Sequence, residues 1–159
     1  GVDPASLGLL TSAARSGVAH AETPIVPPIF LSYPRARLDW VREHIHGPIA
    51  RRFGADRVFF DVESLTAGAA WLATLAAGVQ GCRAFVAVYC AEYFQSEFCQ
   101  WELQLALARD PLGRRGIVVP LFAERVDLPA YCSLVQAETI AGDRLPDRVL
   151  ATIGRAVHP

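Results

Sequence analysis

The sequence predicts an α/β fold in which a parallel β-sheet is covered by helices on both faces. Short apolar runs alternate with segments of helical periodicity, in the order βαβαβαβ followed by a less regular end. The run at 82–90, "CRAFVAVYC", is apolar almost throughout, which is typical of a central parallel strand buried on both faces. A chain of 159 residues has room for one such domain with a sizeable core.

The first elements follow a long polar segment. Residues 1–27 are rich in small and polar residues and end in several prolines, so we expect a flexible N-terminal tail or linker, with the domain at 28–159. "PIFLSY" at 28–33 is a short apolar run and predicts a buried strand. The segment 37–53 has helical spacing, and Pro48 should bend or split that helix.

The remaining elements continue the alternation. Ser96 is the expected N-cap of the third helix, whose first turn carries an acidic residue that suits the helix dipole. We predict a strand at 57–62, a loop at 63–68, a helix at 69–79, the central strand at 82–90, a helix at 96–109, a strand at 116–122, a weaker edge strand at 133–140 and a closing helix at 147–157. In such sheets, ligands bind outside the carboxyl ends of the strands.

Composition excludes several classes of partner. The net charge of -1 gives no reason to expect nucleic acid or an anionic membrane, and no apolar run approaches the roughly 20 residues of a membrane-spanning helix. The cysteines, Cys82, Cys90, Cys99 and Cys132, lack the spacing of a zinc site, so we expect no metal, free thiols and a cytoplasmic, reducing location. The absence of methionine leads us to expect a piece of a longer protein or a processed chain.

Several common catalytic sites are absent from the sequence. It contains neither a G-x-G-x-x-G motif after the first strand nor a Walker A motif. None of the four histidines follows a strand, which argues against a Ser/His or Cys/His nucleophile. A phosphorelay receiver has a similar strand order, but it requires a lysine after its fifth strand, and this chain has no lysine.

Glu102 stands out in the third helix, "FCQWELQLAL". On a helical projection it lies roughly 85° from the centre of the apolar stripe, and Phe98 lies one turn before it. We therefore expect Glu102 at the rim of the buried face, with a pKa raised by partial burial. Substitution at a rim position should change stability by no more than about 0.5 kcal/mol. The alternative is an ordinary solvated glutamate.

Three stretches together resemble the TIR (Toll/interleukin-1 receptor) domain family. They are "IFLSYPR" for the first strand and its loop, "RVFFDVESLTAGAAW" for the second strand and the BB loop, and "CRAFVAVYCAEYFQSEFCQWELQLAL" for the third strand and helix. The resemblance covers about residues 28–157. It implies a flavodoxin-like three-layer sandwich with a central five-stranded parallel sheet. Some members are signalling adaptors, whereas others cleave NAD+ at the nicotinamide–ribose bond.

In the NAD+-cleaving members, a glutamate of the third helix is catalytic, and Glu102 matches it. Arg35 matches a position that is often basic near the substrate, although a solvated loop arginine is the alternative. Glu63 matches an acidic residue at the start of the BB loop of the axon-degeneration enzyme, where it could instead order the loop. Phe98 stands where that enzyme has a tryptophan, so either base stacking or core packing is implied. Tyr33 ends the first strand and either packs or contacts the substrate.

The resemblance therefore implies an NAD+ glycohydrolase that releases nicotinamide and gives ADP-ribose or a cyclic ADP-ribose. NAD+ would be consumed as substrate, so no cofactor is expected. The implied setting is a bacterial, antiphage immune effector activated by oligomerisation, with homotypic contacts through the BB loop at 63–68 and a sensor or oligomerising domain elsewhere in the full protein. Trp71 and Trp101 are interpreted as packing or assembly residues. The alternative function is a non-catalytic TIR interaction module.

Overall fold

The structure is a computed structural model that describes residues 26–60, 69–140 and 142–158 of the chain. The predicted tail at 1–27 falls almost wholly outside these residues, as do Glu63 and the rest of the predicted loop at 63–68.

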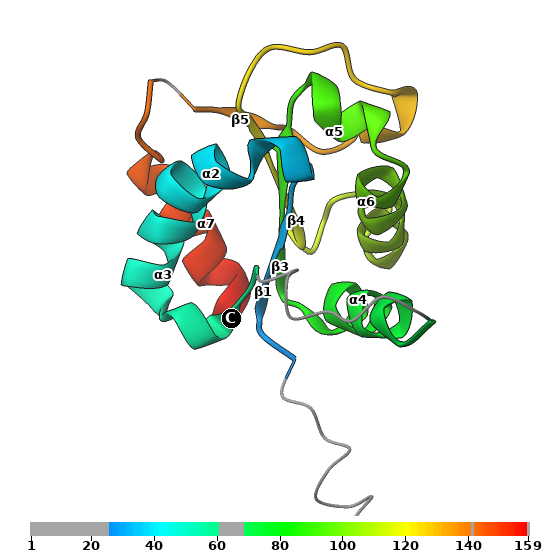
Figure 1. The fold of residues 1–159 in the computed structure, drawn as a ribbon, viewed down its shortest axis with the longest axis horizontal. Coiled ribbons are helices and arrows are strands. Elements are labelled where there is room, and N and C mark those ends of the chain that lie inside the picture. Colours follow the sequence, from blue (N-terminus) through cyan, green and yellow to red (C-terminus); the bar gives the residue numbers. More distant parts are fainter. Residues whose placement is uncertain (1–25, 61–68, 141, 159) are drawn as a thin grey trace, which may run out of the picture.

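Within the described residues, five parallel strands form one sheet in the order β2-β1-β3-β4-β5. This confirms the predicted flavodoxin-like arrangement. Every residue of β1 and β3 is buried, because both strands lie inside the sheet and helices cover both of its faces (Figure 1). The strands are β1 (Ile29–Ser32), β2 (Val58–Phe59), β3 (Ala84–Tyr89), β4 (Val118–Phe122) and β5 (Glu138–Thr139).

Helices pack on the two faces of the sheet and divide the core in two (Figure 1). One face receives α2 (Leu38–Val41), α3 (Gly47–Phe53) and α7 (Asp147–Val157); the other receives α4 (Ala69–Gly81), α5 (Ala91–Gln95) and α6 (Glu97–Arg109). Successive residues of β1 alternate between these cores, so Ile29 and Leu31 pack towards α7 while Phe30 packs towards α4.

The helix predicted at 37–53 forms, and it widens just before Pro48. A 3-10 turn, η1 (Arg35–Arg37), leads into α2, a π-helical turn η2 (Arg42–His46) follows, and α3 continues to Phe53. The Gly47 N–H donates to the Arg42 carbonyl five residues back, as a π-helical turn requires. Pro48 has no N–H, and in a regular α-helix its ring would clash with the carbonyl four residues earlier, which explains the wider turn.

Three elements differ from their prediction. The second strand was expected at 57–62, but its described part pairs only over Val58–Phe59, after a 3-10 turn η3 (Ala55–Arg57). The edge strand expected at 133–140 is reduced to Glu138–Thr139, because a 3-10 turn η4 (Ala130–Cys132) follows Pro129 and satisfies the backbone locally. The short helix α5 was not predicted.

All four cysteines are free and buried, as expected for thiols that behave as small apolar side chains. In the part of the chain that the structure describes, no helix combines the length and the apolar character needed to cross a membrane.

Candidate active site

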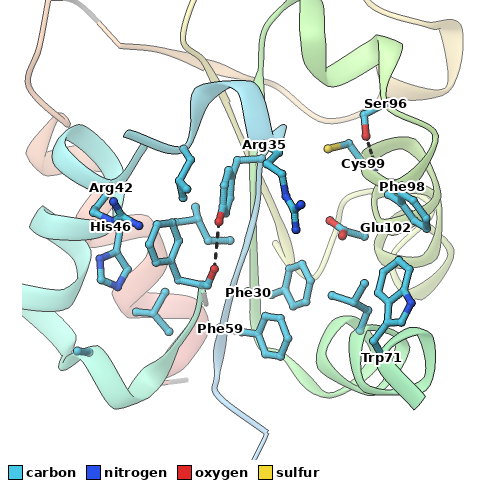
Figure 2. A pocket seen from close by; sticks show the side chains of 17 residues that line it. Phe30, Arg35, Arg42, His46, Phe59, Trp71, Ser96, Phe98, Cys99 and Glu102 are labelled. Carbon is cyan, nitrogen blue, oxygen red and sulfur yellow. Dashed lines mark hydrogen bonds between the residues drawn. The ribbon is translucent and has the colours of Figure 1, made fainter. Parts of the chain in front are cut away.

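A pocket of about 950 Å³ lies at the carboxyl ends of β1 and β2, where ligands bind in sheets of this type. Its walls come from both sides of the sheet (Figure 2). The described residues that carry polar or aromatic groups into it are Phe30, Tyr33, Arg35, Arg42, His46, Phe59, Phe60, Trp71, Ser96, Phe98, Cys99 and Glu102.

Glu102 projects from α6 into this pocket, but it is more deeply buried than its rim position on the helix predicted. Only 9% of the residue is exposed, because β1 and α5 close around the carboxylate. The Ser96 hydroxyl accepts a hydrogen bond from the Cys99 N–H at 3.2 Å and caps α6, as predicted, which fixes where the helix begins. One turn further on, Glu102 receives a 2.6 Å hydrogen bond from the Ser32 hydroxyl at the end of β1.

Burial raises the pKa of Glu102 to about 7, while the hydrogen bond from Ser32 acts in the opposite direction. The direction agrees with the expectation from the sequence. A carboxylate with this pKa is about half ionised at neutral pH, and it retains a strong tendency to accept a proton or to stabilise an adjacent positive charge.

Aromatic side chains line the pocket on the Glu102 side. The Phe98 ring lies edge-on to the Trp71 ring, with 4.9 Å between centroids. Half of Phe98 is exposed, which favours the stacking interpretation of this residue over core packing. Trp71, interpreted as a packing or assembly residue, packs against the core on this face of the sheet and also lines the pocket. Phe30 and Phe59 also line the pocket and stack with 4.8 Å between their ring centroids (Figure 2).

Arg35 and Tyr33 follow β1 and reach the same pocket. The exposed Arg35 side chain extends its guanidinium towards Glu102 (Figure 2). Tyr33 is half-buried, and its hydroxyl donates to the Phe60 carbonyl at 3.1 Å. This bond ties the loop after β1 to the end of β2, so Tyr33 shapes the pocket wall. Glu63, the other expected site residue, lies outside the described residues.

The wall opposite Glu102 contains two groups that sequence reasoning missed, Arg42 and His46. The His46 ring stacks on Phe60 with 4.2 Å between centroids. Its pKa is lowered, first by burial and then by the charge of Arg42. His46 was set aside because it does not follow a strand, but Arg42 and His46 stand four residues apart on one helical face, a spacing that could have paired them.

A second cluster of polar groups lies outside the pocket. Ligand atoms of Cys90, Glu92 and Glu124 lie within 4.8 Å of one another. The Arg37 guanidinium already pairs with Glu92 at 3.3 Å and with Glu124 at 2.9 Å. This arrangement joins η1 to helix α5 and to the loop after β4, and we assign it a structural role.

The fold and the pocket together define a flavodoxin-like α/β domain with a buried acid at its strand ends. A TIR domain family model matches residues 29–148, and the chain belongs to the TIR domain family. Among solved structures, the TIR domain of the Toll-related receptor TRR-2 from Hydra magnipapillata is similar, with a TM-score of 0.66 and 12% identity over 83% of this chain and 98% of that chain. At this identity the likeness concerns the fold alone. A search of curated proteins found no match.

Proposed function

We propose that this TIR domain cleaves the nicotinamide–ribose bond of NAD+. The observation that carries the proposal is the position of Glu102, a buried acid with a pKa of about 7 that faces a pocket large enough for a dinucleotide. The product is ADP-ribose or a cyclic ADP-ribose.

The chemistry of the bond fits a site with a single acidic group. In NAD+ the nicotinamide ring is a positively charged pyridinium. When its bond to the ribose breaks, nicotinamide departs as a neutral molecule, so the leaving group needs no general acid. The ribose left behind develops positive charge, which the ionised Glu102 can stabilise while it accepts hydrogen bonds from the ribose hydroxyls. A water oxygen then bonds to the anomeric carbon and releases a proton to solvent, which gives ADP-ribose; in cyclisation an adenine nitrogen bonds there instead. One well-placed group of this kind contributes on the order of 10²–10³ in rate. The proposed mechanism uses neither a metal nor a cofactor.

The other walls suit the rest of the dinucleotide. Phe98 offers a half-exposed ring, close to Glu102, on which a nicotinamide or adenine base can stack. Arg42 brings positive charge to the wall opposite Glu102, and Arg35 brings it to the middle of the pocket, with its guanidinium towards Glu102 (Figure 2). A diphosphate placed against these arginines would keep the ribose beside Glu102.

The proposed setting follows from family membership. TIR domains generally assemble with one another, and we propose that assembly through the BB loop at 63–68 completes the site of a neighbouring copy. A cytoplasmic antiphage effector, with a separate sensor or oligomerising domain, is the role we propose for the full protein.

The decisive experiment compares Glu102→Gln with Glu97→Gln in the same helix. Glu97 is exposed in the first turn of α6 and does not line the pocket, so its variant controls for loss of a helix carboxylate. With concentrated or clustered protein and NAD+, nicotinamide release should fall at least a hundredfold in Glu102→Gln and stay within about twofold in Glu97→Gln. Full activity in Glu102→Gln would remove Glu102 from the catalytic role.

One observation favours a second function, that of a non-catalytic interaction module. Half of Phe98 and 40% of Leu72 are exposed, and apolar side chains of this kind also suit a protein contact. Under this alternative, clustered protein would form assemblies without releasing nicotinamide, and Phe98→Glu would abolish assembly.

A further inference from the structure

Behind Glu102 lies a chain of buried hydroxyl groups that the proposed reaction does not use. Ser32 is 1% exposed and Tyr93 is fully buried. The Ser32 Oγ atom is 2.6 Å from Glu102 Oε2 and 2.9 Å from the Tyr93 hydroxyl. The three side chains come from different elements, β1, α5 and α6, so the tertiary fold brings them together.

The direction of these hydrogen bonds follows from a count of protons. A serine hydroxyl has one proton to donate, and Ser32 donates it to the ionised Glu102. The Tyr93 hydroxyl must then donate to Ser32 for the second contact to be a hydrogen bond. If Tyr93 did not donate, the Ser32 proton could turn away from Glu102 towards the tyrosine oxygen.

We propose that Tyr93 is a positioning residue, whose hydroxyl holds the Ser32 proton on the Glu102 carboxylate and thereby favours its ionised, reactive form. The effect of Tyr93 on turnover rests on the proposed NAD+ cleavage, whereas its effect on the pKa of Glu102 does not. Hydrogen bonds in such a chain strengthen one another, and a bond to a charged acceptor is the stronger kind.

The titration of Glu102 must be distinguished from that of the other titratable groups around it. Cys99 lies one turn before it in α6, and burial raises the pKa of that thiol to about 12. Burial also raises the pKa of Tyr93 far above its ordinary value. Arg35 faces Glu102 from η1, and His46 lies on the opposite wall with a lowered pKa (Figure 2). Cys99 and Tyr93 therefore stay neutral between pH 5 and 9, and the lowered pKa of His46 favours its neutral form.

The test is Tyr93→Phe, which removes the hydroxyl and keeps the ring that packs against Tyr89 and Phe94. The matched control is Tyr89→Phe. Tyr89 is equally buried in the same core, but its hydroxyl pairs with Cys132 and not with the Glu102 chain. The Glu102 side-chain carboxyl carbon is followed by NMR during a pH titration without NAD+, with Glu102→Gln used to assign the signal.

Loss of the Tyr93 hydroxyl should raise the pKa of Glu102 by about half a unit to one unit, and Ser32→Ala should raise it further because it removes the direct bond. Tyr89→Phe should leave the pKa unchanged. Turnover of Tyr93→Phe at pH 6 should fall about three- to tenfold, in proportion to the ionised fraction, and return to within about twofold of the native rate at pH 9.

An unchanged Glu102 pKa in Tyr93→Phe, or an equal shift in Tyr89→Phe, would overturn the proposal. If Tyr93→Phe does not fold, the native protein still provides a test, because the ring carbon bonded to the Tyr93 hydroxyl should shift with the same midpoint as Glu102; a flat tyrosine signal would contradict the coupling. Failure of the proposed function gives a different result from failure of the Tyr93 proposal. The titrations would then behave as described, but no nicotinamide would be released at any pH.

Discussion

At the scale of single residues, Glu102 occupies a position that opposes its own ionisation. Its pKa is about 7 instead of the ordinary 4.5, so the folded state binds its proton more tightly than the unfolded state does. The contribution of Glu102 to the free energy of unfolding therefore falls as pH rises from about 4.5 to 7 and does not change above that range. The difference between the two pKa values corresponds to about 3 kcal/mol of stability. This is much larger than the effect that the sequence predicted for a residue at the rim of the buried face.

This reasoning predicts that Glu102→Gln is more stable than the native protein at pH 8. The amide oxygen can still accept the bond from Ser32, but it carries no buried charge. The free energies of unfolding should converge near pH 4.5 and diverge by up to about 3 kcal/mol above pH 7. Urea denaturation of both proteins at pH 4.5, 6 and 8 measures this. Parallel pH dependences would mean that Glu102 is solvated in the folded protein.

Phe98 provides a second prediction at this scale. Because half of the residue is exposed, Phe98→Ala should cost only about 1 kcal/mol of stability, compared with about 3–5 kcal/mol for a core phenylalanine. Loss of base stacking should lower turnover or affinity about ten- to a hundredfold, and Phe98→Trp should keep both. Melting and NAD+ turnover are measured on the same samples. A large fall in melting temperature, with normal turnover by the folded fraction, would assign Phe98 to the core.

At the scale of elements, the start of α6 depends on one side chain. Ser96 accepts from the Cys99 N–H and satisfies one of the free donors of the first turn. Ser96→Ala should lower the free energy of unfolding by about 1 kcal/mol, and Ser96→Asp should restore it, because aspartate accepts the same bond and suits the helix dipole. Urea denaturation distinguishes the two. Equal losses in both variants would show that Ser96 stabilises the protein by some means other than capping.

The π-helical turn η2 leads to a prediction about Arg42. It presents Arg42 and His46 to the pocket wall opposite Glu102, where a phosphate would find positive charge (Figure 2). Arg42→Ala should raise the KM for NAD+ about tenfold, the value of one charged hydrogen bond, and should not affect cleavage of nicotinamide riboside, which has no phosphate. Arg51→Ala, an exposed arginine of α3 that does not line the pocket, is the control. An equal effect on both substrates would place Arg42 outside the phosphate site.

At the scale of the whole molecule, some elements were predictable because their local sequence pattern is enough to specify them, whichever elements pack beside them. The uninterrupted apolar run of β3 predicts a buried strand, and the periodicity and acidic start of α7 predict its bounds, Asp147–Val157. The lengths of β2 and β5 could not be predicted, because pairing at a sheet edge depends on the adjacent strand and loop.

The site was predictable to the same degree. Glu102 and Phe98 share a helix and a helical period, so the sequence predicted that both face one cleft, and both line the same pocket. The buried partners Ser32 and Tyr93 are far from Glu102 in sequence, and their contact arises only when β1, α5 and α6 pack together. His46 reaches the pocket for a similar reason, because the pocket extends around the carboxyl ends of β1 and β2 to the other face of the sheet.

Assembly is the remaining question at this scale, and it can be tested with an inactive copy. If a loop of one copy completes the Glu102 site of the next, specific activity should rise with protein concentration. Addition of excess Glu102→Gln to dilute native protein should then also raise nicotinamide release, because the inactive copy still supplies its loop. An equal excess of an unrelated protein controls for crowding, which has only a weak effect on folded proteins. Flat specific activity from nanomolar to high micromolar protein, with no response to Glu102→Gln, would show that each chain contains a complete site.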